Sequence, residues 1–379
     1  MRSRAIALIS LCSLCIFLFV TEASSEDRNF DQAKLFYERG DYAVSLDYIN
    51  KSIDADPSNF VAWINKGQIL TTLGRLNESL VAYKKATEIR PDDIRAWINM
   101  GAVLASLKRY NESLWAYDNA TKLDPKNANL WYEKGMLFAD LKMYNESIEA
   151  YGNATDVDPG FSMAWNSKGS ILALVGRFNE SLEAYNASIK LDPGRATTWY
   201  NKGVVLSNLG RINESLAEYD KAIEINPDYA EAWNSKGIDF SELGRYEEAI
   251  QAYEKAIETN PKYVDAWFNK GQALRRLHRY DDALKCYNKT TELDPKSARN
   301  WNSKGQALAN MQRYEEAIQA YDRAIEVSKP GYTLPWSNKG YALQALGRDK
   351  EADEAFAKAK ERRNGESKPE AKTADQPQA

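Results

Sequence analysis

The sequence predicts an all-α protein built of repeated helix pairs, and three columns of residues predict it. In the 379-residue chain, proline, tryptophan and glycine each recur every 34 residues over most of the length. A tryptophan follows each of these prolines after six residues, and a glycine follows each tryptophan after four. The tryptophans in register are Trp63, Trp97, Trp131, Trp165, Trp199, Trp233, Trp267, Trp301 and Trp336. Such a period is the signature of a repeat architecture, in which each unit is one supersecondary element.

Within one unit the apolar spacing is helical. Trp63, Gly67 and Leu70 lie at i, i+4 and i+7, which places them on one face of a first helix. A turn at Gly74 precedes a second stripe that contains Tyr83. A glycine inside a helix costs about 1 kcal/mol relative to alanine. Its recurrence at the position of Gly67 therefore predicts a close approach of the two helices.

A helix pair of this kind cannot bury its own apolar face, so neighbouring pairs must stack into a continuous core. The columns resemble the tetratricopeptide repeat (TPR) family, whose pattern is met by Trp63, Gly67, Tyr83, Ala86 and Pro91 and by their copies. The resemblance implies a right-handed TPR solenoid, a superhelix with the first helices on its concave side. We expect ten units, at residues 26–59, 60–93, 94–127, 128–161, 162–195, 196–229, 230–263, 264–297, 298–332 and 333–366.

Both ends of the chain are expected to lie outside the repeats. Residues 1–23 are typical of a secretory signal, because two arginines precede the apolar run 5–20 and small residues allow cleavage after Ala23. The run is short for a membrane-spanning helix of about 20 residues. The alternative is that the segment is an uncleaved membrane anchor. We therefore expect an exported chain that is either secreted or tethered through residues 5–20 to the outer face of the cytoplasmic membrane, within the cell envelope. The polar tail 367–379 is expected to be disordered.

Composition argues against several classes of site. One histidine and three cysteines leave little for a metal centre or a disulfide scaffold, and Cys286 is the one cysteine beyond the signal segment. A net charge of −4 is unlike that of a nucleic-acid binder, which needs basic excess to neutralise phosphates. No glycine-rich phosphate loop, metal cluster or nucleophile–base pair is found in the sequence, so we expect no catalysis and no cofactor. Cys286 is expected to be a buried, inert thiol.

A ladder of asparagines and aromatic residues is the candidate binding surface. In the TPR family the residue after the tryptophan lies on the concave face, and here this column alternates between the two types: Tyr132, Asn166, Tyr200, Asn234, Phe268 and Asn302. The next column contributes Asn65, Asn99, Asn201, Asn269 and Asn338. Amides can donate to and accept from a peptide backbone, and aromatic rings supply stiff contact area. We hypothesise that the ladder holds an extended partner segment. The alternative is duplication of a two-repeat block whose asparagines only solvate a surface.

Asn-x-Ser/Thr sequons are more frequent than chance predicts. Five of them repeat the tripeptide Asn-Glu-Ser, at Asn77, Asn111, Asn145, Asn179 and Asn213. This tripeptide is an acceptor for N-glycosylation in an export pathway that uses it. The alternative is structural, because the serine takes a small packing position that alanine takes in later units. We expect these asparagines to open the second helices and to be exposed.

The TPR resemblance implies binding of proteins or peptides. We therefore expect a non-catalytic extracytoplasmic scaffold that binds its partner through the concave face. The alternative function is a structural, glycosylated component of the cell envelope that self-associates.

Overall fold

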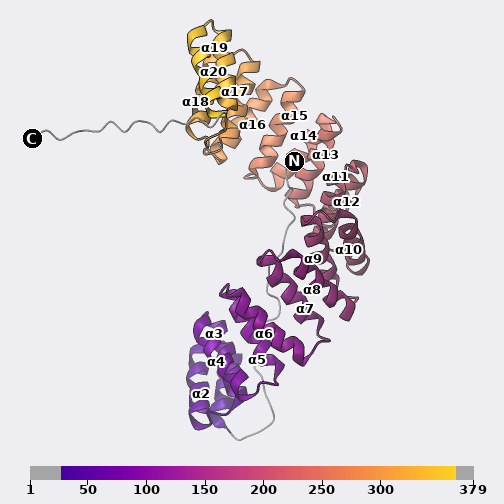
Figure 1. Cartoon of the computed structure of the whole chain (residues 1–379), viewed down its shortest axis with the longest axis vertical. Coiled ribbons are helices and arrows are strands. Elements are labelled where there is room, and N and C mark those ends of the chain that lie inside the picture. Colours follow the sequence, from indigo (N-terminus) through magenta and orange to yellow (C-terminus); the bar gives the residue numbers. More distant parts are fainter. Residues whose placement is uncertain (1–26, 364–379) are drawn as a thin grey trace, which may run out of the picture. The chain divides into compact units, whose positions relative to one another are not determined.

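Every element of the part of the chain that the structure describes is an α-helix. The structure is a computed structural model, and it describes residues 27–363. Within each compact part of the chain, consecutive helices pack in pairs, each an odd-numbered first helix and an even-numbered second helix (Figure 1). The predicted all-α repeat fold is therefore confirmed. The predicted signal segment 1–23 and the tail 367–379 lie outside the described residues.

The chain divides into two compact units after Val205, inside the eleventh helix. The described part of the first unit contains α1 (Arg28–Glu38), α2 (Tyr42–Ala55), α3 (Phe60–Thr72), α4 (Leu76–Ile89), α5 (Ile94–Ser106), α6 (Tyr110–Leu123), α7 (Ala128–Asp140), α8 (Tyr144–Val157), α9 (Ser162–Leu174), α10 (Phe178–Leu191) and most of α11 (Ala196–Asn208).

The second unit begins with the last turn of α11. It continues with α12 (Ile212–Ile225), α13 (Ala230–Glu242), α14 (Tyr246–Thr259), α15 (Val264–Arg276), α16 (Tyr280–Leu293), α17 (Ala298–Asn310), α18 (Tyr314–Glu326), α19 (Leu334–Ala345) and α20 (Asp349–Arg363).

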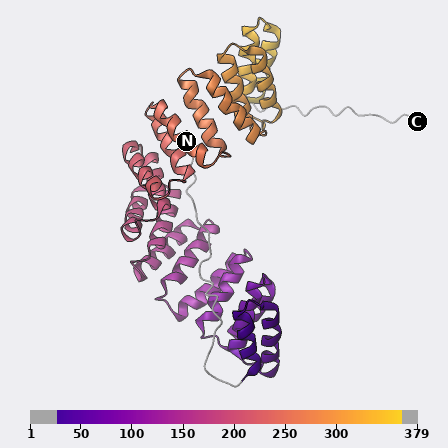
Figure 2. The same ribbon diagram turned by 180° about the vertical axis from the view of Figure 1, so that it is seen from behind.

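In both units the first helices of successive pairs also contact one another. The α3 helix contacts α5 in the first unit, and α15 contacts α13 in the second. Figure 2 shows the pairs from behind, in chain order within each unit. We call the surface formed by the odd-numbered helices the first-helix face. The second helices form the opposite surface, which we call the second-helix face.

A hydrogen bond explains why proline and tryptophan recur six residues apart. Trp63 Nε1 donates to the carbonyl oxygen of Pro57 at 2.9 Å. The same bond, at 2.8–3.2 Å, recurs for Trp97, Trp131, Trp165, Trp199, Trp233, Trp267 and Trp301. Trp336 follows the single 35-residue interval, and its Nε1 has no hydrogen-bond partner. The indole thus fixes the loop between two repeats as well as filling space.

The glycine column is required by the tyrosine column. A Cβ atom placed on Gly135 would lie 2.7 Å from Cδ1 of Tyr151, a distance that side-chain atoms do not tolerate. The same overlap, with a nearest distance of 2.5–3.0 Å, occurs in every other pair from α3–α4 to α19–α20 for which the contact is described. Since Tyr151 is 3% exposed, the ring fills the gap that the missing side chain leaves.

The serines of the sequons close the same helix–helix contact. Ser79, Ser113, Ser147 and Ser181 are fully buried, and each donates its hydroxyl to the carbonyl oxygen of the glycine on the preceding helix at 2.7–2.8 Å. This bond satisfies a buried hydroxyl that would otherwise destabilise the pair.

Candidate functional site

The structure places most of the predicted ladder inside the packing between repeats. Within the described residues, Tyr132, Tyr200, Asn234, Phe268 and Asn302 are only 4–6% exposed, and Asn65 and Asn201 are fully buried. Asn99, Asn166, Asn269 and Asn338 are half-buried. A residue so enclosed can reach a partner only where a cavity opens onto it.

Several asparagines of the ladder bond to each other instead of pointing outward. Asn269 Nδ2 donates to Asn234 Oδ1 at 3.0 Å, and Asn338 Nδ2 donates to Asn302 Oδ1 at 2.8 Å. Each bond joins two neighbouring first helices of the second unit. These amides therefore contribute to the repeat interface, and a partner would have to compete with them.

Tyr132 and Asn166 differ from the rest because they line a cavity. The cavity encloses about 290 Å³ between α7, α8 and α9 of the first unit. Met136, Met163 and Leu174 supply apolar walls, and Arg195 lies at its edge. The small side chains Ala139, Ser167 and Ser170 leave the space open. Its size and composition suit one apolar side chain of a bound polypeptide.

An unused acceptor lies in this cavity. The Asn166 Oδ1 atom is buried and has no hydrogen-bond partner, whereas the corresponding atoms of Asn234 and Asn302 accept from a neighbouring amide. A buried acceptor without a donor costs about 1–3 kcal/mol, and a peptide N–H would remove that cost. Among the described ladder residues, Asn201 also has a buried amide without a hydrogen-bond partner, but Asn166 is the one of the two that lines this cavity.

Tyrosine hydroxyls beside this acceptor stay neutral. Burial raises the pKa of both Tyr132 and Tyr151 above the ordinary value, because a phenolate would lose its hydration there. The Tyr132 hydroxyl accepts a long hydrogen bond of 3.5 Å from Ser167 Oγ. The cavity thus offers neutral hydroxyls, an amide oxygen and apolar walls, and its charged lining residues are Asp140, Lys142 and Arg195.

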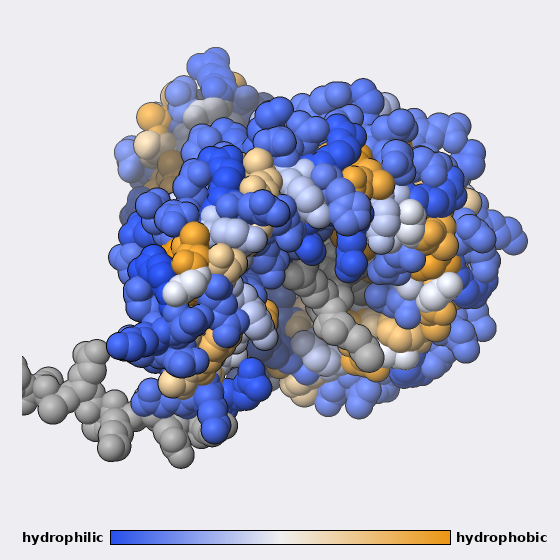
Figure 3. All heavy atoms as spheres, turned by 90° about the horizontal axis from the view of Figure 1, so that it is seen from above, coloured by the Kyte–Doolittle hydropathy of each residue, from blue (hydrophilic) through white to orange (hydrophobic). Residues whose placement is uncertain are grey.

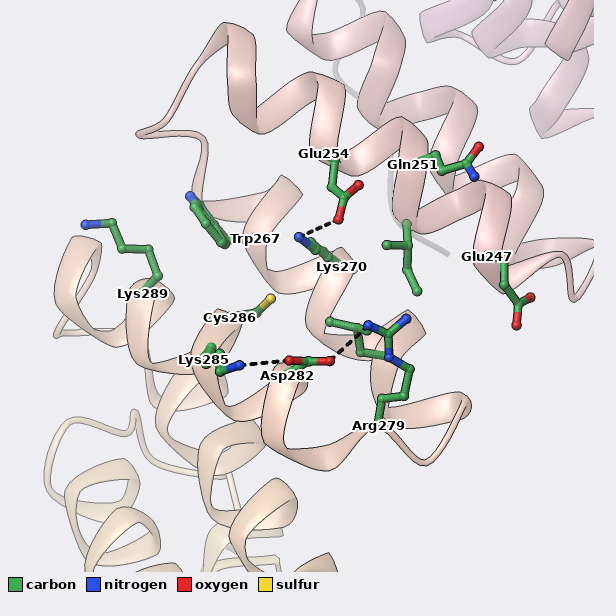
Figure 4. A pocket seen from close by; sticks show the side chains of 12 residues that line it. Glu247, Gln251, Glu254, Trp267, Lys270, Arg279, Asp282, Lys285, Cys286 and Lys289 are labelled. Atoms are coloured by element: carbon green, nitrogen blue, oxygen red, sulfur yellow. Dashed lines mark hydrogen bonds and ion pairs between the residues drawn. The ribbon is translucent and has the colours of Figure 1, made fainter.

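A larger cavity of about 730 Å³ lies between α14, α15 and α16 (Figure 4). Most of its charged side chains form ion pairs with one another. Lys270 Nζ lies 2.8 Å from Glu254 Oε1, and Asp282 lies between Lys285 and Arg279 at 3.0 and 2.9 Å. Glu247 and Lys289 also line the cavity, and Lys289 forms an ion pair with Glu292, which lies outside the lining.

Cys286 lines that larger cavity, where burial disfavours its thiolate form. It is 3% exposed, and burial raises the pKa of its thiol to about 11. A thiol of that pKa is protonated at neutral pH and is a poor nucleophile.

The five asparagines of the Asn-Glu-Ser tripeptides are exposed. Each is the second residue of its second helix, as Asn111 is in α6. These asparagines are therefore accessible to solvent, although their serines are buried.

Asp239 is a buried carboxylate that the sequence interpretation missed. It is fully buried in α13 and accepts a hydrogen bond from Ser207 Oγ at 2.7 Å and another from Ser215 Oγ. The corresponding residue of other units is apolar, as at Ile69 and Leu137. Alignment of the repeats at this position could have revealed the aspartate. It could not have revealed the two serines that donate hydrogen bonds to the carboxylate.

Within residues 27–363, no three His, Cys, Asp or Glu side chains are grouped so as to hold a metal ion. In the same range, no helix combines the length and apolar character needed to cross a membrane. On the face drawn in Figure 3, hydrophilic residues prevail and apolar residues form small separate groups.

Sequence models of the tetratricopeptide repeat match most of the chain. One matches residues 144–196, 234–298, 270–333 and 302–369, and two others match 194–262 and 94–127. A model described as TPR repeat matches 67–108. Among curated proteins, no sequence matches the chain.

Several solved structures are similar to parts of the chain. The crystal structure of YrrB, described as a TPR protein with an unusual peptide-binding site, is 26% identical over 50% of this chain and 97% of its own, with a TM-score of 0.44. MamA is 25% identical over 43% of this chain and 95% of its own, with a TM-score of 0.41. A tetratricopeptide repeat protein from Parabacteroides merdae is 20% identical over 62% and 92%, with a TM-score of 0.49.

Proposed function

Because the chain belongs to the tetratricopeptide repeat family, we propose that it is a non-catalytic scaffold that binds an extended segment of a partner protein. The observation that carries the proposal is the cavity between α7, α8 and α9, with its unpaired Asn166 oxygen. In this arrangement an apolar side chain enters the cavity, and a backbone N–H of the partner donates to Asn166 Oδ1.

The ladder then divides into two roles. Tyr132 and Asn166 form the contact with the partner, while Asn234 and Asn302 hold neighbouring first helices together through Asn269 and Asn338. Specificity for an extended segment follows, because a peptide in that conformation presents free backbone amides that a helix does not.

The proposal includes an extracytoplasmic location. It is supported by the basic and apolar pattern of residues 1–23 and by the small residues before the cleavage point. N-terminal sequencing of the protein purified from the cells that produce it tests whether the chain is exported and cleaved. Ser24 is expected, and Met1 would contradict cleavage.

Peptide selection followed by calorimetry tests the binding site. A random peptide library displayed on phage is selected on the purified chain, and the dissociation constant of the recovered peptide is measured for the wild type, Asn166→Ala and Asn302→Ala. We expect a consensus with an apolar residue at one position. Asn166→Ala should weaken binding about tenfold, because it removes one buried hydrogen bond.

Asn302→Ala is the matched control. It removes an amide from the same column, but one that bonds to Asn338 and lines no part of this cavity. It should lower the stability of the chain and leave the dissociation constant unchanged. Equal binding by the wild type and Asn166→Ala would refute the proposed site.

A further inference from the structure

Trp115 is an exposed tryptophan on the second-helix face. It lies in α6 and is 57% exposed, whereas no other tryptophan is among the exposed large apolar side chains of residues 27–363. Its ring makes an edge-to-face contact with the ring of Trp97, with ring centroids 5.2 Å apart and planes at 79°. The ring is therefore held in place from one side and open to solvent on the other.

The residue one helical turn before Trp115 is the sequon asparagine Asn111. Side chains at i and i+4 are neighbours on a helix surface, and those of long residues lean toward the helix N-terminus. The Trp115 ring thus leans toward Asn111. The same relation recurs on α4, where Val81, 66% exposed, lies one turn after Asn77.

Contacts within the helix pair account for the glutamate and the serine of the Asn-Glu-Ser tripeptide, but not for the asparagine. In α6, Glu112 binds Arg109 through two hydrogen bonds of 2.6 and 2.7 Å, and Ser113 bonds to Gly101. Asn111 is exposed, and its side chain makes no hydrogen bond within residues 27–363. An acidic residue would suit the first turn of a helix better than asparagine does.

The later repeats show that alternative. At the positions of Asn111 and Ser113, α14 has Glu247 and Ala249. The α16 and α18 helices likewise combine an acidic residue with alanine. Asparagine and serine occur together from α4 to α12 and are replaced together in α14, α16 and α18, although the serine's packing position accepts alanine. In α2, the serine (Ser45) occurs without the asparagine, whose position is Ala43. This coupling is expected if the pair is kept as an acceptor for a saccharide.

We propose that Asn111 carries an N-linked glycan whose first sugar ring packs on the open face of Trp115. The C–H face of a pyranose is apolar and matches the exposed indole in size, so the contact removes apolar surface of both from water. The sugar covers a ring that would otherwise be an exposed apolar site.

The attachment needs an activated donor, which we assign to the glycosyl phosphate class. The Asn111 Nδ2 atom forms a bond to the anomeric carbon while the bond from that carbon to a phosphate oxygen breaks. The phosphate leaves with the bonding electron pair, and a base of the transferase takes one amide proton. Since the Ser113 hydroxyl is fully buried in the folded repeat, the transferase must act before α6 packs against α5.

Asn119 provides a contrast on the same helix. It is also a sequon, and it lies one turn after Trp115. Its Nδ2 atom donates to the Trp115 carbonyl oxygen at 2.8 Å, and its side chain is half-buried. The glycan that packs against the Trp115 ring is therefore assigned to Asn111 and not to Asn119.

Glycopeptide mapping combined with hydroxyl-radical footprinting tests the proposal. The chain is purified from the cells that produce it, as wild type and as Asn111→Gln, Ser113→Ala and Asn145→Gln. We expect an occupied Asn111 in the wild type. Trp115 should be oxidised about fivefold faster in Asn111→Gln, a ratio that corresponds to about 1 kcal/mol for the contact.

The variants separate loss of the glycan from loss of the fold. Ser113→Ala keeps the asparagine and introduces the residue that Ala249 provides at the same buried position, so it should fold and also expose Trp115. Asn145→Gln removes a sequon whose neighbour one helical turn later is Glu149, where Asn111 has Trp115. This variant should leave Trp115 protected from oxidation. An unmodified Asn111 peptide, or equal oxidation of Trp115 in all four proteins, would overturn the proposal. Neither result affects the peptide cavity, which is tested on unmodified protein.

Discussion

At the scale of single residues, this chain uses positions of one column for different purposes. Asn302 holds two repeats together, whereas Asn166 keeps its oxygen free in a cavity. Cys286 occupies a position that is alanine in most other repeats, such as Ala252 and Ala320. A buried side chain can thus change in polarity or acidity while the backbone period is preserved.

The thiol of Cys286 makes the stability of the chain depend on pH. Burial raises its pKa from 9.0 to about 11, so the folded state holds the proton more tightly than the unfolded state. The associated stability is fully present below pH 9.0 and is lost as the pH rises toward about 11. The wild type should lose about 1 kcal/mol more than Cys286→Ala between about pH 8 and about pH 10.

Urea unfolding at several pH values measures this loss. Cys286→Ala is a suitable reference, because alanine is the residue at the same position in most other repeats. Parallel pH curves for the two proteins would show that the thiol does not titrate with a raised pKa.

At the scale of helices, the contact between the two members of a pair depends on an absent side chain. Gly135 of α7 faces the Tyr151 ring of α8, and a Cβ atom there would lie 2.7 Å from the ring. Gly152 of α8 is also helical, but the nearest atom to its Cβ position is Lys168 Nζ, at 3.6 Å. The same substitution therefore has opposite consequences at two positions of one repeat.

Gly135→Ala should destabilise the chain by about 1–2 kcal/mol, because the overlap with Tyr151 outweighs the better helix propensity of alanine. Gly152→Ala should stabilise it by up to about 1 kcal/mol, since it gains propensity without a clash. Chemical denaturation of both variants measures the difference. Stabilisation by both substitutions would contradict the packing argument.

At the scale of the whole molecule, each helix pair relies on its neighbours. The apolar faces of one pair are covered by the next pair along the chain, and the Trp–Pro hydrogen bond fixes the loop between them. Such arrays gain stability through nearest-neighbour interfaces, so one complete unit is interchangeable with another.

Removal of residues 264–297, which deletes α15 and α16 together, should preserve the helical content per residue and a cooperative thermal transition. Removal of residues 264–280 should abolish the cooperative transition, because it deletes α15 and leaves α16 without its partner helix. Circular dichroism during heating distinguishes the two. Retention of a cooperative transition by the shorter deletion would show that the pair is not the structural unit.

Sequence alone was sufficient to predict the helix pairs, because their period, their turn glycines and their glycine–tyrosine columns are local and repeated. In the turn between α15 and α16, His278 stands where other repeats have glycine and takes the same left-handed conformation, with φ of 59°. Burial of Cys286 followed from its place beside a core tyrosine.

The candidate site was predicted only in part. The ladder pattern included Tyr132 and Asn166, but it also included Asn234 and Asn302, which the structure bonds to neighbouring amides. Nothing in the column distinguishes these asparagines. Asn201 lies 35 residues after Asn166, as Asn269 lies 35 residues after Asn234. The structure nevertheless shows a hydrogen bond only between Asn234 and Asn269.

The sequence by itself thus determined the helix pairs, the order of the repeats and the family, since each follows from short-range periodicity. Only the tertiary structure decided which side of a given side chain is covered. It left Asn166 without a donor, buried Asp239 between two serines and exposed Trp115 beside Asn111. The reason is physical: burial and hydrogen bonding depend on contacts between helices, and similar repeats differ in those contacts through single substitutions in their neighbours.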